Sequence, residues 1–177
     1  MGDDKLTLFL SADEIHQLNV QLGKTITQTC QKNGIESLLC VVTLKGAIFF
    51  AADLIRHIPI PLKIDFIRLS SYGAGTSSSG TVRVVKDLET SIEGQHVLIL
   101  DEIVDSGRTI AFLIEKVSNL APKSVRVATL LSKPSRREVP VQIDFCGKEI
   151  DDTFVVGYGL DYNERYRELK DIYSVVT

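Results

Sequence analysis

The hydrophobic positions of the chain follow two recurring patterns, short unbroken apolar runs and longer stretches with helical spacing. Residues 38–42 and 97–100 are runs of the first kind. Each is bounded by polar residues, which is typical of a strand buried on both faces of a parallel sheet. Each is followed by a short loop and by a stretch that predicts a helix, over residues 47–58 and from 109 to 120. The chain therefore contains repeated strand–loop–helix units.

The alternation of strands and helices predicts an α/β domain with a central, mostly parallel sheet flanked by helices. Ser11 and Glu14 match a capping box, and the apolar face that follows predicts a helix ending near Asn33 and Gly34. Further strands are expected at residues 63–69, 81–85, 124–131, 141–145 and 172–176.

The composition is that of a soluble globular protein. The 177 residues suit one domain, and a hydrophobic content of 44% and a charged content of 24% are ordinary values. A net charge of −3 argues against a broad nucleic-acid-binding surface. Cys30, Cys40 and Cys146 have neither disulfide-framework nor metal spacing, and we expect neither a signal peptide nor a membrane span. These features predict a cytoplasmic protein with neither nucleic acid nor a membrane as its partner.

The run at residues 97–100 leads into the segment with the most chemistry, which begins with the carboxylates of Asp101, Glu102 and Asp105. Ligands of open α/β sheets bind outside the carboxyl ends of the strands, and a helix N-terminus offers unpaired N–H groups to an anion. The acids would repel a phosphate unless they contact sugar hydroxyls or a divalent metal, so the segment predicts a ribose 5-phosphate site. The residues suited to the phosphate are Ser106, Gly107, Arg108 and Thr109.

The alternative interpretation of this segment is an acidic loop before an ordinarily capped helix. Three acids at the end of a strand would then carry charge without a partner, which makes this interpretation the weaker one. The chain contains no G-x-x-x-x-G-K-[ST], and no G-x-G-x-x-G stands between a strand and a helix. Two common phosphate-binding motifs are therefore absent.

Three other loops contain candidate site residues. Lys45 and Gly46 follow the run at residues 38–42, where a solvated lysine is the alternative to an anion site. Residues 70–80 offer almost no apolar surface, and a loop of this length in a compact domain is more often an active-site lid than a flexible linker. Lys133 begins a basic cluster that could equally be a solvated turn or a nucleic-acid patch.

Residues 97–109 resemble the phosphoribosyl-diphosphate signature of type I phosphoribosyltransferases, and they are most similar to the bacterial hypoxanthine-guanine members of that family. One departure is the order Asp101 then Glu102, because those members usually have Glu before Asp. The similarity extends from about Ser11 to Ile172. It implies the type I fold, with a small hood formed mainly by the C-terminal part and a mobile β-ribbon lid.

The resemblance also implies roles for residues outside the signature. Residues 44–46 resemble the family's pyrophosphate loop, which contains a non-proline cis peptide bond. Ser71 and Tyr72 resemble its mobile catalytic loop, and Lys133 takes the place of a lysine that donates to the 6-oxo group of a purine.

Residues 152–167 resemble the family's base-binding segment almost residue for residue. In that segment Phe154 would stack on the purine, and Val155 would contact the edge of the base with its backbone. Asp161 would face a magnesium ion, and Arg167 would reach the pyrophosphate.

The expected reaction is transfer of the 5-phosphoribosyl group from phosphoribosyl diphosphate to N9 of hypoxanthine or guanine, which gives IMP or GMP and releases pyrophosphate. Asp105 would be the general base at N7, while Asp101, Glu102 and Asp161 would help to place Mg²⁺. The resemblance also implies a homodimer or homotetramer. The alternatives are a phosphoribosyltransferase for xanthine, uracil or adenine, or a regulator that keeps the fold and binds nucleic acid. The acidic balance and the full set of expected catalytic positions argue against the regulator.

Overall fold

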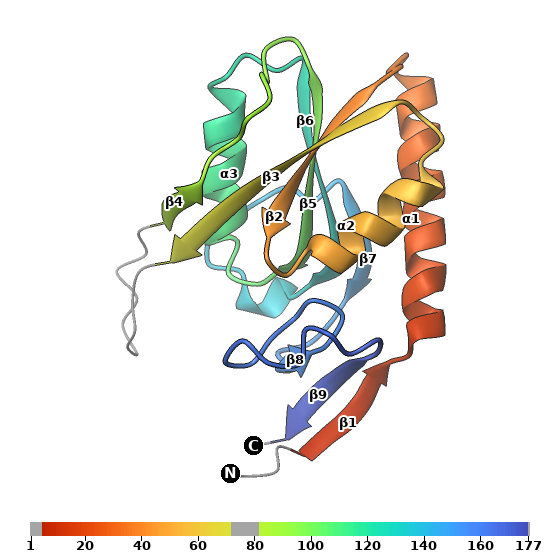
Figure 1. The fold of residues 1–177 in the computed structure, drawn as a ribbon, viewed down its shortest axis with the longest axis vertical. Helices are drawn as coiled ribbons and strands as arrows, with labels where there is room; N and C mark the ends of the chain where they lie inside the picture. Colours follow the sequence, from red (N-terminus) through yellow and green to blue (C-terminus); the bar gives the residue numbers. More distant parts are fainter. Residues whose placement is uncertain (1–4, 72–81, 177) are drawn as a thin grey trace.

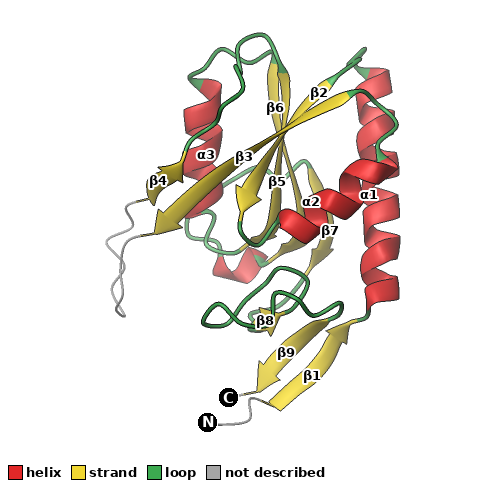
Figure 2. Ribbon diagram, viewed as in Figure 1, coloured by secondary structure: helices red, strands yellow, loops and turns green. Residues whose placement is uncertain are grey.

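The computed structural model describes residues 5–71 and 82–176, which form a larger sheet with helices on both faces and a smaller sheet below it (Figure 1; Figure 2). The helices are α1 (Ala12–Lys32), α2 (Ile48–Leu54) and α3 (Arg108–Ser118), with the 3-10 turns η1 (Ile55–His57) and η2 (Pro134–Arg136). The strands are β1 (Lys5–Leu10), β2 (Leu38–Leu44), β3 (Leu62–Ser71), β4 (Val82–Lys86), β5 (His96–Val104), β6 (Ser124–Ser132), β7 (Phe145–Glu149), β8 (Val155–Val156) and β9 (Ile172–Val176).

The larger sheet has the strand order β4-β3-β2-β5-β6-β7, and its neighbouring strands are parallel except for β3 and β4. The expected α/β fold with a central, mostly parallel sheet is therefore confirmed. The capping box is also confirmed, since Ser11 Oγ accepts from Glu14 N at 3.3 Å and Ser11 N donates to Glu14 Oε2 at 2.8 Å.

The strand expected at residues 141–145 is wrong, because β7 begins at Phe145 and runs on to Glu149. The reason lies in Asp144, whose carboxylate accepts from Val127 N on the edge of β6 at 2.8 Å. A side chain thus occupies the donor that a strand at this point would need, and pairing between β6 and β7 starts only at Ala128 and Phe145.

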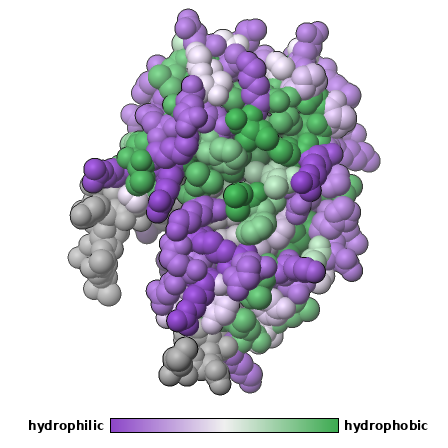
Figure 3. Space-filling model, viewed as in Figure 1, coloured by the Kyte–Doolittle hydropathy of each residue, from purple (hydrophilic) through white to green (hydrophobic). Residues whose placement is uncertain are grey.

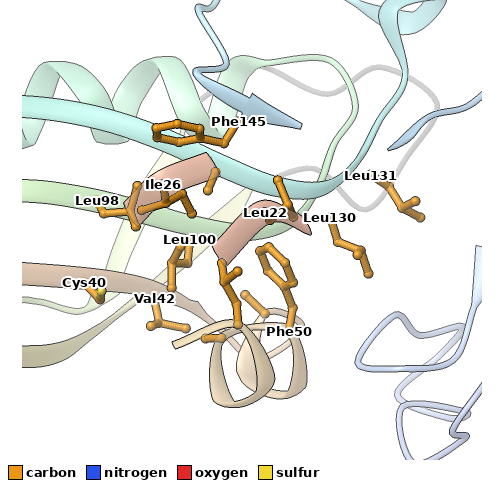
Figure 4. Packing of buried hydrophobic residues seen from close by; sticks show 14 of the residues in the cluster. Leu22, Ile26, Cys40, Val42, Phe50, Leu98, Leu100, Leu130, Leu131 and Phe145 are labelled. Carbon is orange, nitrogen blue, oxygen red and sulfur yellow. The ribbon is translucent and has the colours of Figure 1, made fainter. Parts of the chain in front are cut away.

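Buried side chains on the two faces of the sheet explain why the central strands are apolar without interruption. Alternate residues of β5 point to opposite faces, so Leu98 and Leu100 pack with α1 and α2 while Val97 and Ile99 pack with α3. Figure 4 shows the cluster on the face of α1 and α2. Its contributors from the helices include Ile15, Leu22, Ile26, Phe50 and Leu54.

The smaller sheet, with the order β1-β9-β8, is the expected hood and lies beyond the carboxyl ends of β2 and β5 (Figure 1). Its central strand, β9, pairs with β8 on one side and with β1 on the other, and the hydrophobic pattern did not predict β1. The joint between β1 and α1 is fixed by Ala12 N, which donates to Asp171 Oδ1 at 2.7 Å. The hood is therefore built from both ends of the chain.

The strands that flank the expected lid, β3 and β4, form an antiparallel pair from Arg68 to Ser71 and from Val82 to Lys86. Tyr72 and the rest of the expected lid, up to Gly80, lie outside the described residues. None of the helices in the described part of the chain is long and apolar enough to cross a membrane.

Candidate functional site

The carboxyl ends of β2, β5 and β6 meet at one edge of the sheet, because these strands are parallel neighbours. A direct contact joins the first two ends: Thr43 Oγ1 donates to the carboxylate of Asp101 and, at 3.2 Å, to Leu100 O. A cavity of about 220 Å³ opens at this edge. Its lining is Thr43, Leu44, Leu69, Thr109, Ile110 and residues 101–107.

Two adjacent carboxylates, on Asp101 and Glu102, line this cavity. Asp101 is only 8% exposed, and burial raises its pKa. Burial raises the pKa of Glu102 well above its ordinary value, and the neighbouring charge of Asp101 raises it further. A divalent cation or sugar hydroxyls would relieve this repulsion, so the donor set fits both expected ligands.

The described residues contain no group of three or more acidic, histidine or cysteine side chains that could hold a metal by themselves. Asp161, the third expected magnesium ligand, has one oxygen 2.8 Å from Arg167 Nη2 and the other accepting from Glu164 N at 2.9 Å. Proteins usually hold Mg²⁺ with one or two carboxylates together with water and substrate phosphates, so a larger cluster of acids would not be needed.

The loop expected to bind phosphate lies at the N-terminus of α3, where the N-cap residue Gly107 has φ +85° and offers no side chain, while Arg108 N donates to Ser106 Oγ at 3.4 Å. A Cβ atom on Gly107 would lie 2.5 Å from Val139 O, so a larger residue would not fit. Glu138 N and Val139 N brace the loop by donating to Ser106 O at 2.9 and 3.1 Å. The guanidinium of Arg108 pairs with Glu138 at 2.6 Å, which leaves the backbone N–H groups as the principal anion donors here.

The peptide bond between Leu44 and Lys45 is cis, as the resemblance implied. The next residue, Gly46, lies so close to β5 that a Cβ atom there would overlap the carboxylate of Glu102. A Cβ atom on Gly159 would overlap the carbonyl oxygen of Gly46. The loop after β2 therefore contacts both the acidic pair and the hood through bare backbone.

The cations expected to hold pyrophosphate are brought together by an acid that the sequence analysis missed. Glu164 Oε2 lies 2.7 Å from Lys45 Nζ and 3.5 Å from Arg167 Nη2. Arg167 also contacts Asp161 and donates through Nη1 to Gly159 O at 2.8 Å. The hydrogen bond from Lys45 lowers the pKa of Glu164, so this carboxylate stays ionised. Two cations from distant segments thus share one anion.

Around Lys133, which is only 5% exposed, the structure gathers three further charges. Its Nζ lies 3.9 Å from Asp105 Oδ2 and 3.9 Å from Asp152 Oδ1. Arg136 makes the shorter contacts, 3.2 Å from Nε to Asp105 Oδ1 and 3.3 Å from Nη1 to Asp152 Oδ2. The sequence analysis assigned no role to Arg136 or Asp152, although both stand within segments that it singled out.

The expected base-stacking residue, Phe154, is 48% exposed and meets Tyr162 edge-on, with ring centroids 5.6 Å apart. Its carbonyl oxygen accepts from Val175 N at 3.0 Å, which fixes its backbone to β9. Val155 is buried in β8. Of the expected catalytic loop, Ser71 is the last residue of β3.

A partly buried hydrogen-bond network attaches the turn between β8 and Asp161 to the helices. Tyr158 has φ +50°, and its hydroxyl donates to Asp53 Oδ2 at 2.6 Å. Asn19 Nδ2 donates to the same hydroxyl at 3.0 Å. Asp53 is on α2 and Asn19 on α1, so both helices hold the turn that presents Gly159 to the loop after β2. Only the fold brings these residues together, and the sequence analysis did not identify them.

Comparison with known proteins is consistent with this geometry. A family model described as the phosphoribosyl transferase domain matches residues 11–163. The chain is 46% identical over 169 residues to the hypoxanthine-guanine phosphoribosyltransferase of Bacillus subtilis strain 168, with 96% of this chain and 92% of that protein covered. It is 42% identical over 176 residues to the hypoxanthine phosphoribosyltransferase of Haemophilus influenzae, with 99% and 98% covered.

A solved structure is similarly close. The crystal structure of a hypoxanthine phosphoribosyltransferase from Staphylococcus aureus matches with a TM-score of 0.91 and 40% sequence identity, covering 98% of this chain and 92% of that one. None of these three relatives is named as a nucleic-acid-binding regulator or as a transferase for another base.

Proposed function

The chain belongs to the phosphoribosyltransferase family, and we propose that it is a purine salvage enzyme that transfers the 5-phosphoribosyl group to hypoxanthine or guanine. The observation that carries this proposal is the joining of three features at one sheet edge. They are the carboxylates of Asp101 and Glu102 near the end of β5, the N-terminus of α3 and the buried amine of Lys133. Phosphoribosyl diphosphate and a 6-oxopurine present the complementary groups.

In the proposed reaction, N9 of the purine bonds to C1 of the ribose while the bond from C1 to pyrophosphate breaks. Asp105 acts as general base and accepts the proton from N7, so the purine ring of the product IMP or GMP is neutral. Lys45 and Arg167 stabilise the charge that grows on pyrophosphate. The contacts of Glu164 support this role, because the same two cations already hold a carboxylate between them.

The ribose hydroxyls and Mg²⁺ are assigned to Asp101 and Glu102, with Asp161 facing the metal from the hood. When bound, the metal would neutralise charge on the diphosphate and orient it. The backbone of residues 106–109 would hold the 5-phosphate. Expected contributions from Ser71 and Tyr72 belong to the same proposal and rest on the resemblance of their loop.

Lys133 is the proposed selector of the base. An ammonium group donates hydrogen bonds and accepts none, so it suits the 6-oxo group of hypoxanthine and guanine and not the 6-amino group of adenine. The burial of this side chain supports the role, since a buried donor left without an acceptor costs roughly 1–3 kcal/mol. Phe154 would stack on the ring, and Val155 would contact its edge.

We further propose a homodimer or homotetramer in the cytoplasm. Hydrophobic residues gather over the middle of the face in Figure 3, where Figure 1 has β3 and α2. Ile48 and Phe49 of α2 and Ile64 of β3 are 45%, 43% and 43% exposed. Apolar surface of this kind marks association interfaces. The three cysteines are free, which suits a reducing compartment.

The test is an assay for IMP and GMP. The purified protein with phosphoribosyl diphosphate and magnesium should convert hypoxanthine and guanine, and chelation of the metal should stop the reaction. Adenine, xanthine and uracil are tested in parallel. Failure to form IMP and GMP, or preference for uracil or adenine, would contradict the proposal. An RNA gel shift in the same preparation tests the regulator, and tight RNA binding without turnover would favour it.

A further inference from the structure

The proposed general base, Asp105, is one corner of a closed ring of four charges. The other corners are Lys133, Arg136 and Asp152. We propose that Arg136 and Asp152 form a positioning pair that holds Asp105 and leaves Lys133 available for the purine, an inference that rests on the proposed function. Neither residue needs to touch the substrate in this role.

The ring joins three loops that follow neighbouring strands, so the position of each charged side chain depends on the other two loops. Asp105 follows β5, Lys133 and Arg136 belong to the turn after β6, and Asp152 lies beyond β7. The turn that carries the two cations is fixed by its backbone, since Lys133 N donates to Val104 O at 3.0 Å and Arg136 N donates to Lys133 O at 3.1 Å. The acids are therefore held by cations whose own backbone is anchored to β5.

The distances show how the four charges are shared. Each carboxylate turns one oxygen to Arg136, at 3.2 and 3.3 Å, and the other to Lys133, at 3.9 Å. A separation of 3.9 Å is too long for a hydrogen bond, so the ammonium of Lys133 keeps its donors for another acceptor. The planar guanidinium, with its several donors, satisfies both acids at once.

Loss of Arg136 would change how the two carboxylates are paired. Two carboxylates would then share the single buried ammonium of Lys133, which would be drawn into direct hydrogen bonds with them. Lys133 would point less readily to a 6-oxo group, and Asp105 would lose the contact that fixes its rotamer. Misplacement of a reacting group by about 1 Å costs up to roughly 10²-fold in rate.

A purely structural role for these pairs is the competing explanation, and exposure argues against it. The side chains of Arg136, Asp105 and Asp152 are 50%, 42% and 56% exposed. Ion pairs at such exposure contribute little to stability. Substitution of Arg136 should therefore affect turnover far more than the unfolding temperature.

The experiment compares Arg136→Met, Arg136→Lys, Asp152→Asn and the double variant that combines Arg136→Met with Asp152→Asn in the IMP assay. Arg136→Met should lower kcat about 10- to 100-fold, with the KM for phosphoribosyl diphosphate within about twofold of wild type. Arg136→Lys should recover part of the lost kcat, because lysine restores the charge but not the planar guanidinium that bonds both acids. The double variant restores neutrality of the ring and should be faster than Arg136→Met alone. Lys116→Met, which breaks an ion pair with Asp87 that involves no site residue, is the control.

Several outcomes would overturn the positioning role. A kcat of Arg136→Met within twofold of wild type, or a rise confined to the KM for hypoxanthine, would show an inert surface pair or a direct substrate contact. Strictly additive effects of Arg136→Met and Asp152→Asn would show that they do not act together. If Arg136→Met does not fold, the same criteria apply to Arg136→Lys. A wild type that makes no IMP overturns both proposals, whereas an active wild type beside an unimpaired Arg136→Met overturns only this one.

Discussion

Replacement of Gly159 by alanine tests whether the hood must lie directly against the loop after β2. Gly159 has φ +99°, and a Cβ atom there would overlap the carbonyl oxygen of Gly46 and approach its carbonyl carbon at 3.0 Å. The atoms it meets are backbone, so no side-chain rotation relieves the contact. Positive φ in a residue other than glycine costs of order 1–3 kcal/mol. The collision must also move the two loops apart.

That movement would act on the pyrophosphate contacts, because Gly159 O accepts from Arg167 Nη1 at 2.8 Å. If the full strain of roughly 1–3 kcal/mol opposes the contact between the hood and the substrate, kcat/KM falls by about 5- to 150-fold. We expect kcat/KM for phosphoribosyl diphosphate to fall within this range for Gly159→Ala. Initial rates with saturating hypoxanthine measure it.

Gly94→Ala is the matched control for backbone strain. Gly94 has φ +69°, and a Cβ atom there would meet nothing within 4 Å. Its replacement should lower the free energy of unfolding, measured with urea, without changing kcat/KM. The reasoning is refuted if Gly159→Ala loses stability to a similar extent while its kcat/KM stays within twofold of wild type.

Four further substitutions follow from the site. Asp105→Asn should lower kcat by roughly 10²–10⁴ while calorimetry shows nearly unchanged binding of phosphoribosyl diphosphate; unchanged kcat would contradict its role as base. Lys133→Met should lower kcat/KM for hypoxanthine and guanine and bring these values closer to kcat/KM for adenine. An unaltered ratio of kcat/KM for hypoxanthine to that for adenine would exclude Lys133 as the selector. Glu164→Gln should lower the inhibition constant of pyrophosphate by about two- to fivefold, with exposed Glu168→Gln as control. Because burial raises the pKa of Glu102, the folded protein keeps its proton at higher pH than the unfolded chain, and stability falls as pH rises above the ordinary value of 4.5. In magnesium-free buffer, Glu102→Gln should therefore raise the unfolding temperature near pH 8 but not near pH 4, and an equal effect at both would contradict the assignment.

The contiguous part of the site could be predicted from the sequence because its chemistry and its structure are both local. An apolar run, three acids and a small-residue turn before a helix specify the end of β5 and the start of α3 within about a dozen residues. The expected acidic loop is shorter than predicted, because β5 extends to Val104 and includes Asp101 and Glu102. The same holds for the capping box at Ser11. Hydrophobic period and turn chemistry are sufficient where a strand is buried on both faces.

The parts that could not be predicted depend on contacts between distant segments. Lys45 and Glu164 are 119 positions apart, and Glu164 lies in an irregular turn with φ +63° that no periodicity indicates. The start of β7 was misplaced because the hydrogen bond that Val127 N donates to the carboxylate of Asp144 outweighs the alternation of residues 141–145. Likewise only one of the six residues of β1, Leu10, is buried, so its pairing with β9 left no amphipathic signal.

The modest effect expected for Glu164→Gln follows from how the site holds its cations without a ligand. Lys45 and Arg167 share Glu164, and Arg167 has Asp161 as well, so neither cation is left unpaired. Pyrophosphate must therefore exchange with a carboxylate that is already bound. The side chain of Glu164 is 63% exposed, and ion pairs at such exposure are weak. Removing this pair should strengthen pyrophosphate binding by no more than about fivefold, whereas a much larger gain would mean that Glu164 blocks the site and is not merely a stand-in for the ligand's charge.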